Sequence, residues 1–227
     1  MFKRLYYILL QRLYVLKNKK RVCNGKVYMF HNVSDEDDIY TVSKDNFEKF
    51  IDKLSKTKKI VDFETLVNNP DSDNVVITFD DVYESVYRNA YPILKEKNIP
   101  YYLFICNEFL DKDSYIKTDE VVEMLKESKC IVGSHNYRHE LSRFKDRNTV
   151  KEEFINSKKE LEDKFGVKID SMAFPFGSMY AVSEDNIEDA GNIYEYVCMT
   201  YPLSYSREDA KVLPRINMNS KEANKEL

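Results

Sequence analysis

Short apolar runs alternate along this chain with longer segments in which apolar residues recur at helical spacing. The short runs are rich in β-branched and aromatic residues, which favour strands. We expect strands at residues 26–30, 59–63, 75–79, 100–106, 130–133, 171–174, 194–200 and 211–218. Where apolar positions keep to one face of a helix, we expect helices at residues 45–54, 83–97, 118–128, 149–165 and 183–191.

Capping and breaking residues mark the ends of several of these helices. Pro92 is expected to kink or step the helix at 83–97, because proline lacks the N–H that an α-helix needs. The other expected caps are Ser43, Thr118, the Thr149–Glu152 pair and, at a C-terminus, Gly166.

Strands that alternate with helices indicate βαβ units and therefore a parallel sheet of the α/β class. Six to eight short strands of this kind either close into a barrel or stay in an open, doubly wound sheet. No repeat, low-complexity tract or long linker divides the 227 residues, a length that suits one domain. We therefore expect a single domain over residues 25–227, preceded by a separate segment at 1–24.

The segment at 1–24 combines an apolar run with a cluster of basic residues, four of them among 17–21. On one face of a helix it places Leu5, Ile8, Leu9, Leu13 and Leu16. The segment is too short and too charged to span a bilayer, and no small-residue cleavage site follows it. Two interpretations remain open: an amphipathic helix on an anionic membrane surface, or a helix packed on the domain or a partner with its basic face in solvent.

Composition narrows the partners and the compartment. The 35 basic and 39 acidic residues leave a net charge of −4, which does not favour nucleic acid as a partner. Because they form no CxxC or other close pair, we expect reduced core thiols at Cys23, Cys106, Cys130 and Cys198. We therefore expect a protein that is cytoplasmic or bound to the inner face of a membrane, with an extracytoplasmic location left open.

Residues of reactive or unusual chemistry fall where the predicted strands end. In a parallel α/β domain the carboxyl ends of the strands meet at one edge, where functional residues collect. All three histidines of the chain lie at or just after such an end. The residues placed there are His31, Asp80, Asp81, Ser134, His135, Pro175 and Phe176.

Two of the histidines, His135 and His139, are four residues apart. On a helical turn this spacing puts both imidazoles on one face, within reach of one ion. Two histidines and one carboxylate leave open positions on a metal, as hydrolytic sites require. The alternative is a pair of unrelated surface or capping histidines, but the acid pair nearby in the predicted topology favours the metal site.

Asp80 and Asp81 can serve one site only where the strand ends and the backbone turns, because successive strand residues point to opposite faces. One of them can bind the metal while the other accepts a proton from the attacking water. The alternative, an aspartate that caps the following helix, accounts for only one acid. His31 remains open as a third ligand, a general acid or a core histidine, and residues 174–177 as a substrate wall with an oxyanion donor or as an ordinary turn.

These residues lie in segments that resemble the polysaccharide deacetylases, also called NodB-homology or carbohydrate esterase family 4 enzymes. The order and spacing of TFDD, HxxxH and FPFG are specific to that family. The branch most similar to the chain is that of the poly-N-acetylglucosamine deacetylases, which opens with a YH-x-V-like segment. The resemblance implies a single distorted, incomplete barrel of the (β/α)7 type. It is carried, between about Lys26 and Asn217, by VYMFHNVSD, ITFDDVYESV, NAYPILKEKNIPYYLFI, GSHNYRH, SKKELEDKFG and MAFPFGS.

The resemblance also implies roles for the site residues. Asp80 matches the catalytic base, and a backbone N–H near Pro175 and Phe176 is implied to hold the oxyanion. The implied reaction removes N-acetyl groups from hexosamine residues of a surface glycan or its lipid-linked precursor. It needs a divalent metal, for which we expect zinc, and the implied ligands are Asp81, His135 and His139.

Three positions depart from the family's pattern. Val82 stands where the family usually has Gly. Ala173 stands where many members have the Arg that orients the base, and Arg215 is our candidate replacement. The usual late histidine acid is missing, since no histidine follows His139. In the similar branch the acid comes from the early histidine, which makes His31 our candidate.

Other functions remain open beside the de-N-acetylase. The same metal site can serve an O-acetyl esterase acting on a glycan, or a two-histidine-one-carboxylate iron oxygenase. The departures at Val82 and Ala173 can also mark a degenerate, non-catalytic member that acts as a glycan-assembly module. The complete set of ligands and acids favours the hydrolase with an N-acetylated glycan as its substrate.

Overall fold

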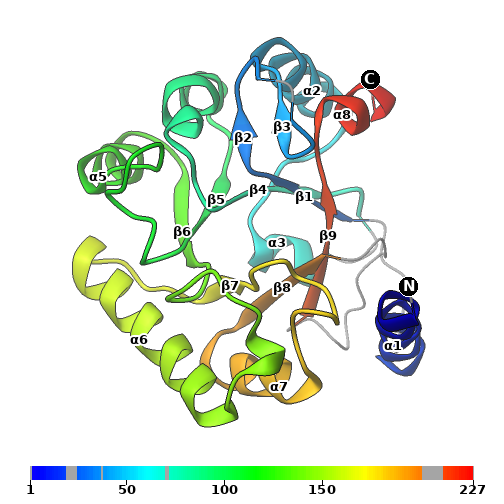
Figure 1. Ribbon diagram of the computed structural model, residues 1–227. Coiled ribbons are helices and arrows are strands. Elements are labelled where there is room, and N and C mark those ends of the chain that lie inside the picture. Colours follow the sequence, from blue (N-terminus) through cyan, green and yellow to red (C-terminus); the bar gives the residue numbers. More distant parts are fainter. Residues whose placement is uncertain (1, 19–24, 37, 70–71, 201–211, 227) are drawn as a thin grey trace.

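Seven parallel strands form a closed ring in the computed structural model, which describes residues 2–18, 25–36, 38–69, 72–200 and 212–226 (Figure 1). The single barrel predicted from the sequence is confirmed. In order around the ring the strands are β1 (Lys26–Phe30), β4 (Val75–Asp80), β5 (Tyr101–Ile105), β6 (Cys130–Ser134), β7 (Ser171–Ala173), β8 (Tyr196–Thr200) and β9 (Val212–Asn217).

The strand pairing is uneven, and this distorts the barrel. The pairs β1–β4 and β5–β6 run in register over five residues each. The β6–β7 pair has a single partnered position, Ser134 with Met172, because β7 is only three residues long. The ring closes where β1 meets β9 over two positions, Tyr28 with Ile216 and Met29 with Asn217. Of the open and closed arrangements left open by the sequence, the closed one therefore forms.

Helices surround the barrel on the outside (Figure 1). A two-stranded sheet of β2 and β3 stands at the mouth side of β1, close to α2 and α8. The elements are β2 (Asn32–Val33), β3 (Thr41–Val42), α2 (Lys44–Thr57), α3 (Phe63–Asn68), α4 (Tyr91–Glu96), α5 (Thr118–Glu127), α6 (Arg147–Phe165), α7 (Glu184–Ile193) and α8 (Ser220–Glu226).

One end of the barrel is sealed by an aromatic plug. The Phe63 ring, at the start of α3, stacks on Tyr102 at 4.1 Å between centroids and lies 5.6 Å from Tyr196. The Phe63 N–H also donates to the Tyr102 hydroxyl over 3.0 Å. Because Tyr102 and Tyr196 stand at the beginnings of their strands, the plug closes the amino end. In the described part of the chain, the carboxyl end of the barrel, where the candidate site residues lie, is the end without such a plug.

One predicted strand is wrong. Residues 59–63 form no strand: Ile60 makes a single bridge to Val75, and Phe63 begins helix α3. The Asp62 carboxylate caps that helix by accepting the Thr65 N–H over 2.8 Å. A short apolar run does not by itself separate a strand from a short helix. The pattern also missed β2, β3 and α8, whose two to seven residues are too few to show a period.

Several signals for helix ends are confirmed. Ser43 caps α2, and Gly166 ends α6 with a left-handed φ of 66°. The helix expected at 83–97 is stepped, since a π-helical turn at Val86–Ala90 precedes α4. Pro92 explains the step, because it has no N–H to continue the α-helical ladder. Free, buried cysteines are also found as expected, at Cys106, Cys130 and Cys198, while Cys23 lies outside the described residues.

Two predicted caps are wrong by one or more residues. Helix α5 begins after Lys117, whose N–H donates to the Glu120 carboxylate over 2.9 Å, so Thr118 is not its cap. Helix α6 begins after Asp146, whose carboxylate accepts the Thr149 N–H over 3.1 Å. In both cases an acid accepts the free N–H groups of the first turn, and a charged acceptor makes the stronger bond.

The expected N-terminal helix is present as α1 (Phe2–Asn18), which lies beside the barrel in Figure 1. Its half-buried Tyr7 packs edge to face on Tyr180 at 5.0 Å, under the Arg143 guanidinium at 5.4 Å. Helix α1 therefore packs on the domain through its tyrosines. Among the described residues, none of the helices combines the length and apolarity that crossing a membrane requires.

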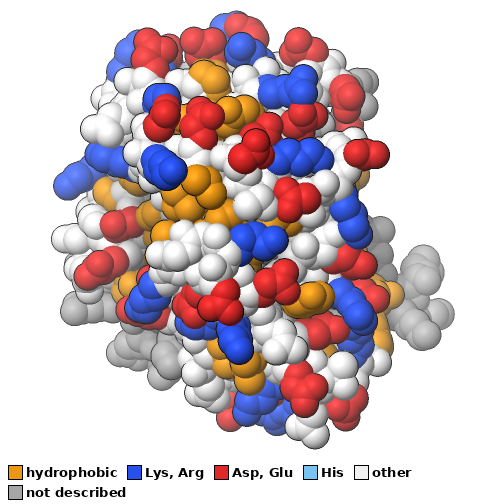
Figure 2. Space-filling model, turned by 90° about the vertical axis from the view of Figure 1, so that its left-hand side faces the viewer, with side chains coloured by type: hydrophobic (Ala, Val, Ile, Leu, Met, Phe, Trp, Pro, Cys, Tyr) orange, Lys and Arg blue, Asp and Glu red, His pale blue; other side chains and the backbone are white. Residues whose placement is uncertain are grey.

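The surface over α5 and α6, at the left of Figure 1, carries acidic and basic side chains side by side (Figure 2). On the coloured part of this face neither sign gathers into a large patch. The mixture agrees with the small net charge of −4.

Candidate metal centre and active site

A cavity of about 650 Å³ opens at the carboxyl end of the barrel. It collects side chains from the ends of β1, β4, β6 and β9 and from the loop after β7. The residues predicted from the sequence that line it are His31, Asp80, Asp81, His135, His139 and Phe176. Segments far apart in the chain therefore meet at the edge where the parallel topology places strand ends.

Three of these side chains converge on one point. The Asp81 Oδ1 atom lies 3.5 Å from His135 Nε2 and 3.3 Å from His139 Nε2. One ligand atom from each of the three residues lies within 4.8 Å of the others. Ligands at about 2.1 Å from a tetrahedral zinc ion are about 3.4 Å apart, so the observed spacing suits one ion.

The His135 ring is held in the orientation that a metal ligand needs. Its Nδ1 atom is 2.9 Å from the Ala173 carbonyl oxygen, which can only accept a hydrogen bond. The proton is therefore on Nδ1, and Nε2 keeps its lone pair for the cavity. Burial lowers the pKa of His135 to about 3, so the ring is neutral, as a ligand must be.

Asp81 shows that the site suits a cation. Within the described part of the chain its Oδ1 atom is buried and has no hydrogen-bond partner. Burial, and then the charge of Asp80, raise the pKa of Asp81 to about 7. A buried carboxylate beside a second carboxylate is costly unless a positive charge compensates it. The donor set of one carboxylate and two neutral imidazoles is therefore suited to a divalent metal ion.

A sharp turn lets both acids face the cavity. Asp81 and Val82 have left-handed backbone angles, with φ of 59° and 50°. The Val82 N–H donates to the Asp80 carbonyl over 2.6 Å, and the Ile116 N–H donates to the Val82 carbonyl over 3.0 Å. A β-branched residue is strained in this region, and the Val82 side chain is kept there by complete burial.

Asp80 is clamped by Arg215 from β9. Two parallel bonds join them, from Arg215 Nη1 to Asp80 Oδ1 and from Nη2 to Oδ2, each 2.6 Å. Burial alone would raise the pKa of Asp80, but the Arg215 guanidinium outweighs it and lowers the pKa to about 2. Ala173, where the family resemblance led us to expect an arginine, is buried and offers only its carbonyl to His135. Arg215 thus reaches the acid from another strand.

His31 also lines the cavity, with its ring 5.2 Å from the Tyr40 ring. Its Nδ1 atom is buried and, among the described residues, has no hydrogen-bond partner. Burial lowers the pKa of His31, while the Asp80 carboxylate acts in the opposite direction. The Asp80 charge therefore acts on His31, but His31 is not part of the group of described residues that can hold a metal.

The loop after β7 covers the metal group from one side. The Phe176 ring is exposed and lies 4.5 Å from the His139 ring. Its φ is 60°, and its backbone N–H makes no hydrogen bond to another described residue. Pro175 has no N–H, so Phe176 is the first residue after it that can offer a backbone donor. Ser134, in contrast, points away and bonds Ser157 over 2.7 Å.

Sequence analysis missed part of the cavity wall. Tyr40, Tyr83, Tyr180 and Asn217 also line it, and the Asn217 Oδ1 atom is buried without a partner in the described part of the structure. The tyrosines come from loops, which lack the regular side-chain periodicity that shows which way a residue of a helix or strand points. Asn217 was within reach, since it closes the same strand end that carries Arg215.

Comparison with known families accounts for this arrangement. The sequence model described as polysaccharide deacetylase matches residues 67–195, more than half of the chain. The chain belongs to the polysaccharide deacetylase family. Members of this family use a divalent metal ion, and the group of described residues able to hold one is Asp81, His135 and His139.

Individual relatives agree with the family. This polysaccharide deacetylase is similar to a poly-beta-1,6-N-acetyl-D-glucosamine N-deacetylase of Staphylococcus aureus (strain MSSA476). The two are 27% identical over 221 residues, and the match covers 88% of this chain and 72% of the relative. IcaB from Ammonifex degensii has a TM-score of 0.78 at 21% identity, over 90% of this chain and 95% of its own. The Streptococcus pyogenes deacetylase PplD has a TM-score of 0.76 at 18% identity, over 88% and 96%. The two structures show the shared fold.

The metal group of this polysaccharide deacetylase can be tested by metal content. We expect His135→Ala and Asp81→Asn to weaken binding of Zn²⁺ by more than about a hundredfold, because outer-shell partners alone are worth 10- to 100-fold. The measurement is equilibrium dialysis followed by elemental analysis. His31→Ala, a change in the same cavity, is the matched control and should keep the wild-type affinity. Equal losses in all three variants would contradict the assignment.

The Asp80–Arg215 pair can be tested by unfolding in urea with metal-free protein. Arg215→Met leaves Asp80 buried and unpaired, so we expect it to lower the free energy of unfolding by about 3–5 kcal/mol. The double variant Asp80→Leu with Arg215→Met removes both charges and should be clearly more stable than Arg215→Met alone. A double variant that is as unstable as the single one would show that the pair is not electrostatically coupled.

Proposed function

We propose that the protein hydrolyses N-acetyl groups from hexosamine residues of a glycan, with a divalent metal ion, preferably zinc, held by Asp81, His135 and His139. The observation that carries the proposal is the clamped Asp80 beside this group at the open end of the barrel. The similarity to a poly-beta-1,6-N-acetyl-D-glucosamine N-deacetylase supports a β-1,6-linked N-acetylglucosamine polymer as the substrate. Each turnover consumes one water molecule and yields acetate and a free amine.

The metal ion, when bound, acts as a Lewis acid that polarises the acetamide carbonyl and acidifies water. Asp80 is the base. Its Oδ2 atom lies 4.0 Å from His135 Nε2, so a water molecule placed at the ligand group is within reach of this carboxylate. Arg215 keeps Asp80 ionised and fixes both of its oxygens, which is the state and geometry that a base needs.

The other two roles fall to His31 and Phe176. Attack on the carbonyl carbon creates an oxyanion, and we assign the N–H of Phe176, which makes no hydrogen bond to another described residue, to donate to it. Collapse of this intermediate expels an amine, which must take a proton as it leaves. His31, which lines the same cavity, supplies that proton to the leaving amine.

Acetate release from a β-1,6-linked N-acetylglucosamine pentamer tests the function. We expect Asp80→Asn to lower kcat by at least about a hundredfold, the usual contribution of a positioned base, without loss of bound metal. A chelator should abolish activity and added Zn²⁺ should restore it. Glu48→Gln, a change at an exposed acid on α2, is the control. Release of acetate only from O-acetylated sugars would mean that the protein is an esterase. Bound metal without either activity would mean that it is a binding module.

The role of His31 can be tested separately, with substrates whose leaving groups differ in their need for a proton. His31→Gln should slow release from the N-acetyl sugar by about a hundredfold or more. It should have little effect on 4-nitrophenyl acetate, whose phenolate leaves without a proton. The measurement compares kcat on the two substrates in the same preparations. A loss of equal size on both would mean that His31 serves another step.

Helix α1 supports a peripheral contact with a membrane. With Tyr7 turned toward the domain, three leucines are left exposed at helical spacing, Leu9 at 55%, Leu13 at 51% and Leu16 at 70%. Basic residues follow them in the sequence, among residues 17–21, of which 19–21 lie outside the described part. Exposed apolar residues followed by bases are the features of a helix that lies on an anionic lipid surface. This favours a membrane surface among the locations left open by the sequence.

Sedimentation with vesicles of phosphatidylglycerol and phosphatidylcholine tests this contact. Replacement of Leu9, Leu13 and Leu16 by Ser should weaken binding by at least about a hundredfold, since each leucine is worth about 1.5–3 kcal/mol when fully buried. Ile155→Ser, which removes an exposed apolar side chain from α6, is the matched control and should bind as the wild type does. Unchanged binding by the triple variant would refute the contact.

A further inference from the structure

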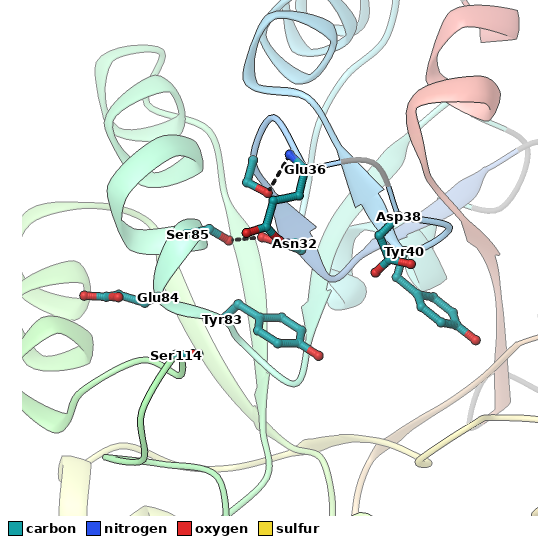
Figure 3. Close-up of a pocket in the computed structure, with 9 residues that line it drawn as sticks. Asn32, Glu36, Asp38, Tyr40, Tyr83, Glu84, Ser85 and Ser114 are labelled. Carbon is teal, nitrogen blue, oxygen red and sulfur yellow. Dashed lines mark hydrogen bonds between the residues drawn. The ribbon is translucent and has the colours of Figure 1, made fainter.

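A second cavity, of about 400 Å³, lies next to the catalytic one (Figure 3). Its described lining residues are Asn32, Ser34, Glu36, Asp38, Tyr40, Tyr83, Glu84, Ser85 and Ser114. Tyr40 and Tyr83 line both cavities, so the two spaces adjoin at these rings. A glycan with one unit at the metal group can therefore place a neighbouring unit beyond the two tyrosines.

The charges of this second cavity are one-sided. Among the described residues, three carboxylates line it, from Glu36, Asp38 and Glu84, and no lysine or arginine does. Glu84 forms an ion pair with Arg88 on the adjoining turn. Within the described ranges, Glu36 and Asp38 have no ion-pair partner, so their two negative charges are uncompensated. In Figure 3 both stand above the tyrosine rings.

Two of the neutral polar side chains of the cavity, Asn32 and Ser85, already have hydrogen-bond partners in the protein. The Ser85 hydroxyl donates to Asn32 Oδ1, and Asn32 Nδ2 donates to the Thr41 hydroxyl over 3.1 Å. The strongest groups left for a ligand are therefore the two carboxylates, which accept hydrogen bonds and attract positive charge. The rings of Tyr40 and Tyr83 add apolar surface on which the carbon face of a sugar can lie.

From this combination of an adjoining cavity, two tyrosine rings and unpaired carboxylates, we infer that the second cavity binds a hexosamine unit whose amine is already free, next to the unit being deacetylated. The inference rests on the proposed function. An N-acetylglucosamine unit is neutral, so Glu36 and Asp38 offer it hydrogen-bond acceptors but no attraction between opposite charges. A glucosamine unit carries an ammonium group and gains from both. Each turnover therefore creates a preferred neighbour for the next, and free amines should accumulate in blocks along the glycan.

The experiment compares β-1,6-linked pentamers that are fully N-acetylated with pentamers that carry one free glucosamine at a defined position. Acetate release gives kcat/KM, and tandem mass spectrometry locates each new amine. We expect the wild type to prefer an acetyl group beside the free amine by about three- to tenfold, the range for two partly exposed ion pairs. Raising the salt concentration should reduce this preference.

The variant Glu36→Gln with Asp38→Asn should lose the preference and keep its kcat/KM on the fully acetylated pentamer. Both side chains are exposed and outside the metal group, so the fold is not at risk. Glu48→Gln with Glu152→Gln, which neutralises two exposed acids on α2 and α6, is the matched control and should keep the preference. A wild type without preference, or an unchanged preference in the Glu36/Asp38 variant, would overturn the inference.

Binding separates the inference from the proposed function. Calorimetric titration with a β-1,6-linked glucosamine trimer, which has no acetyl group to remove, should show tighter binding than the N-acetylated trimer. The Glu36/Asp38 variant should abolish that difference. Absence of acetate release from every pentamer would refute the proposed function, while equal binding of the two trimers would refute the acidic subsite.

Discussion

The ion pair between Asp80 and Arg215 is the constraint on which the active site depends. Both side chains are buried in the barrel, on strands β4 and β9 that are separated by β1. Two buried charges are tolerated only when they meet in good geometry, so this pair demands that the ring close as it does. The pair also has a consequence for the chemistry of the site. With its pKa near 2, Asp80 stays ionised in a place where burial alone would neutralise it. Its Oδ2 atom also lies 4.0 Å from His135 Nε2, so the ionised carboxylate adjoins the group that can hold a metal.

The second constraint is the turn that follows β4. Side chains of neighbouring strand residues diverge, and two left-handed residues in succession bring Asp80 and Asp81 to one cavity. Such a conformation costs about 1–2 kcal/mol for each residue with a Cβ atom. Glycine would avoid much of that cost at the second position, whereas this chain has Val82 there. Its complete burial and the hydrogen bond from Ile116 hold the turn, so packing replaces backbone freedom. The departure from the family pattern is thus compatible with an intact site.

Sequence analysis predicted features that depend on local patterns and missed those that depend on contacts between distant segments. The strand at 75–79 and its two acids were predictable, because a continuous apolar run that stops at two adjacent charges marks both a buried strand and its end. Arg215 was proposed from a missing arginine at Ala173, and only the closed ring explains how β9 reaches β4. The strand expected at 59–63 was wrong because five residues show too little period to exclude a helix. Tyr40, Tyr83 and the second cavity were beyond prediction, since loops meet there only through tertiary packing.

The acids of the barrel follow a gradient from the interior to the rim. Asp80 is the most buried and is compensated by an arginine of the protein itself. Asp81 is partly buried, and no guanidinium clamps it, so its charge is available to a cation held with His135 and His139. Glu36 and Asp38 are exposed and have no basic partner in the described part of the chain, so water and passing cations compensate them. The farther an acid lies from the plugged end, the more its charge is left to a ligand. A glycan that gains ammonium groups as it is deacetylated has the charge that these acids at the rim attract.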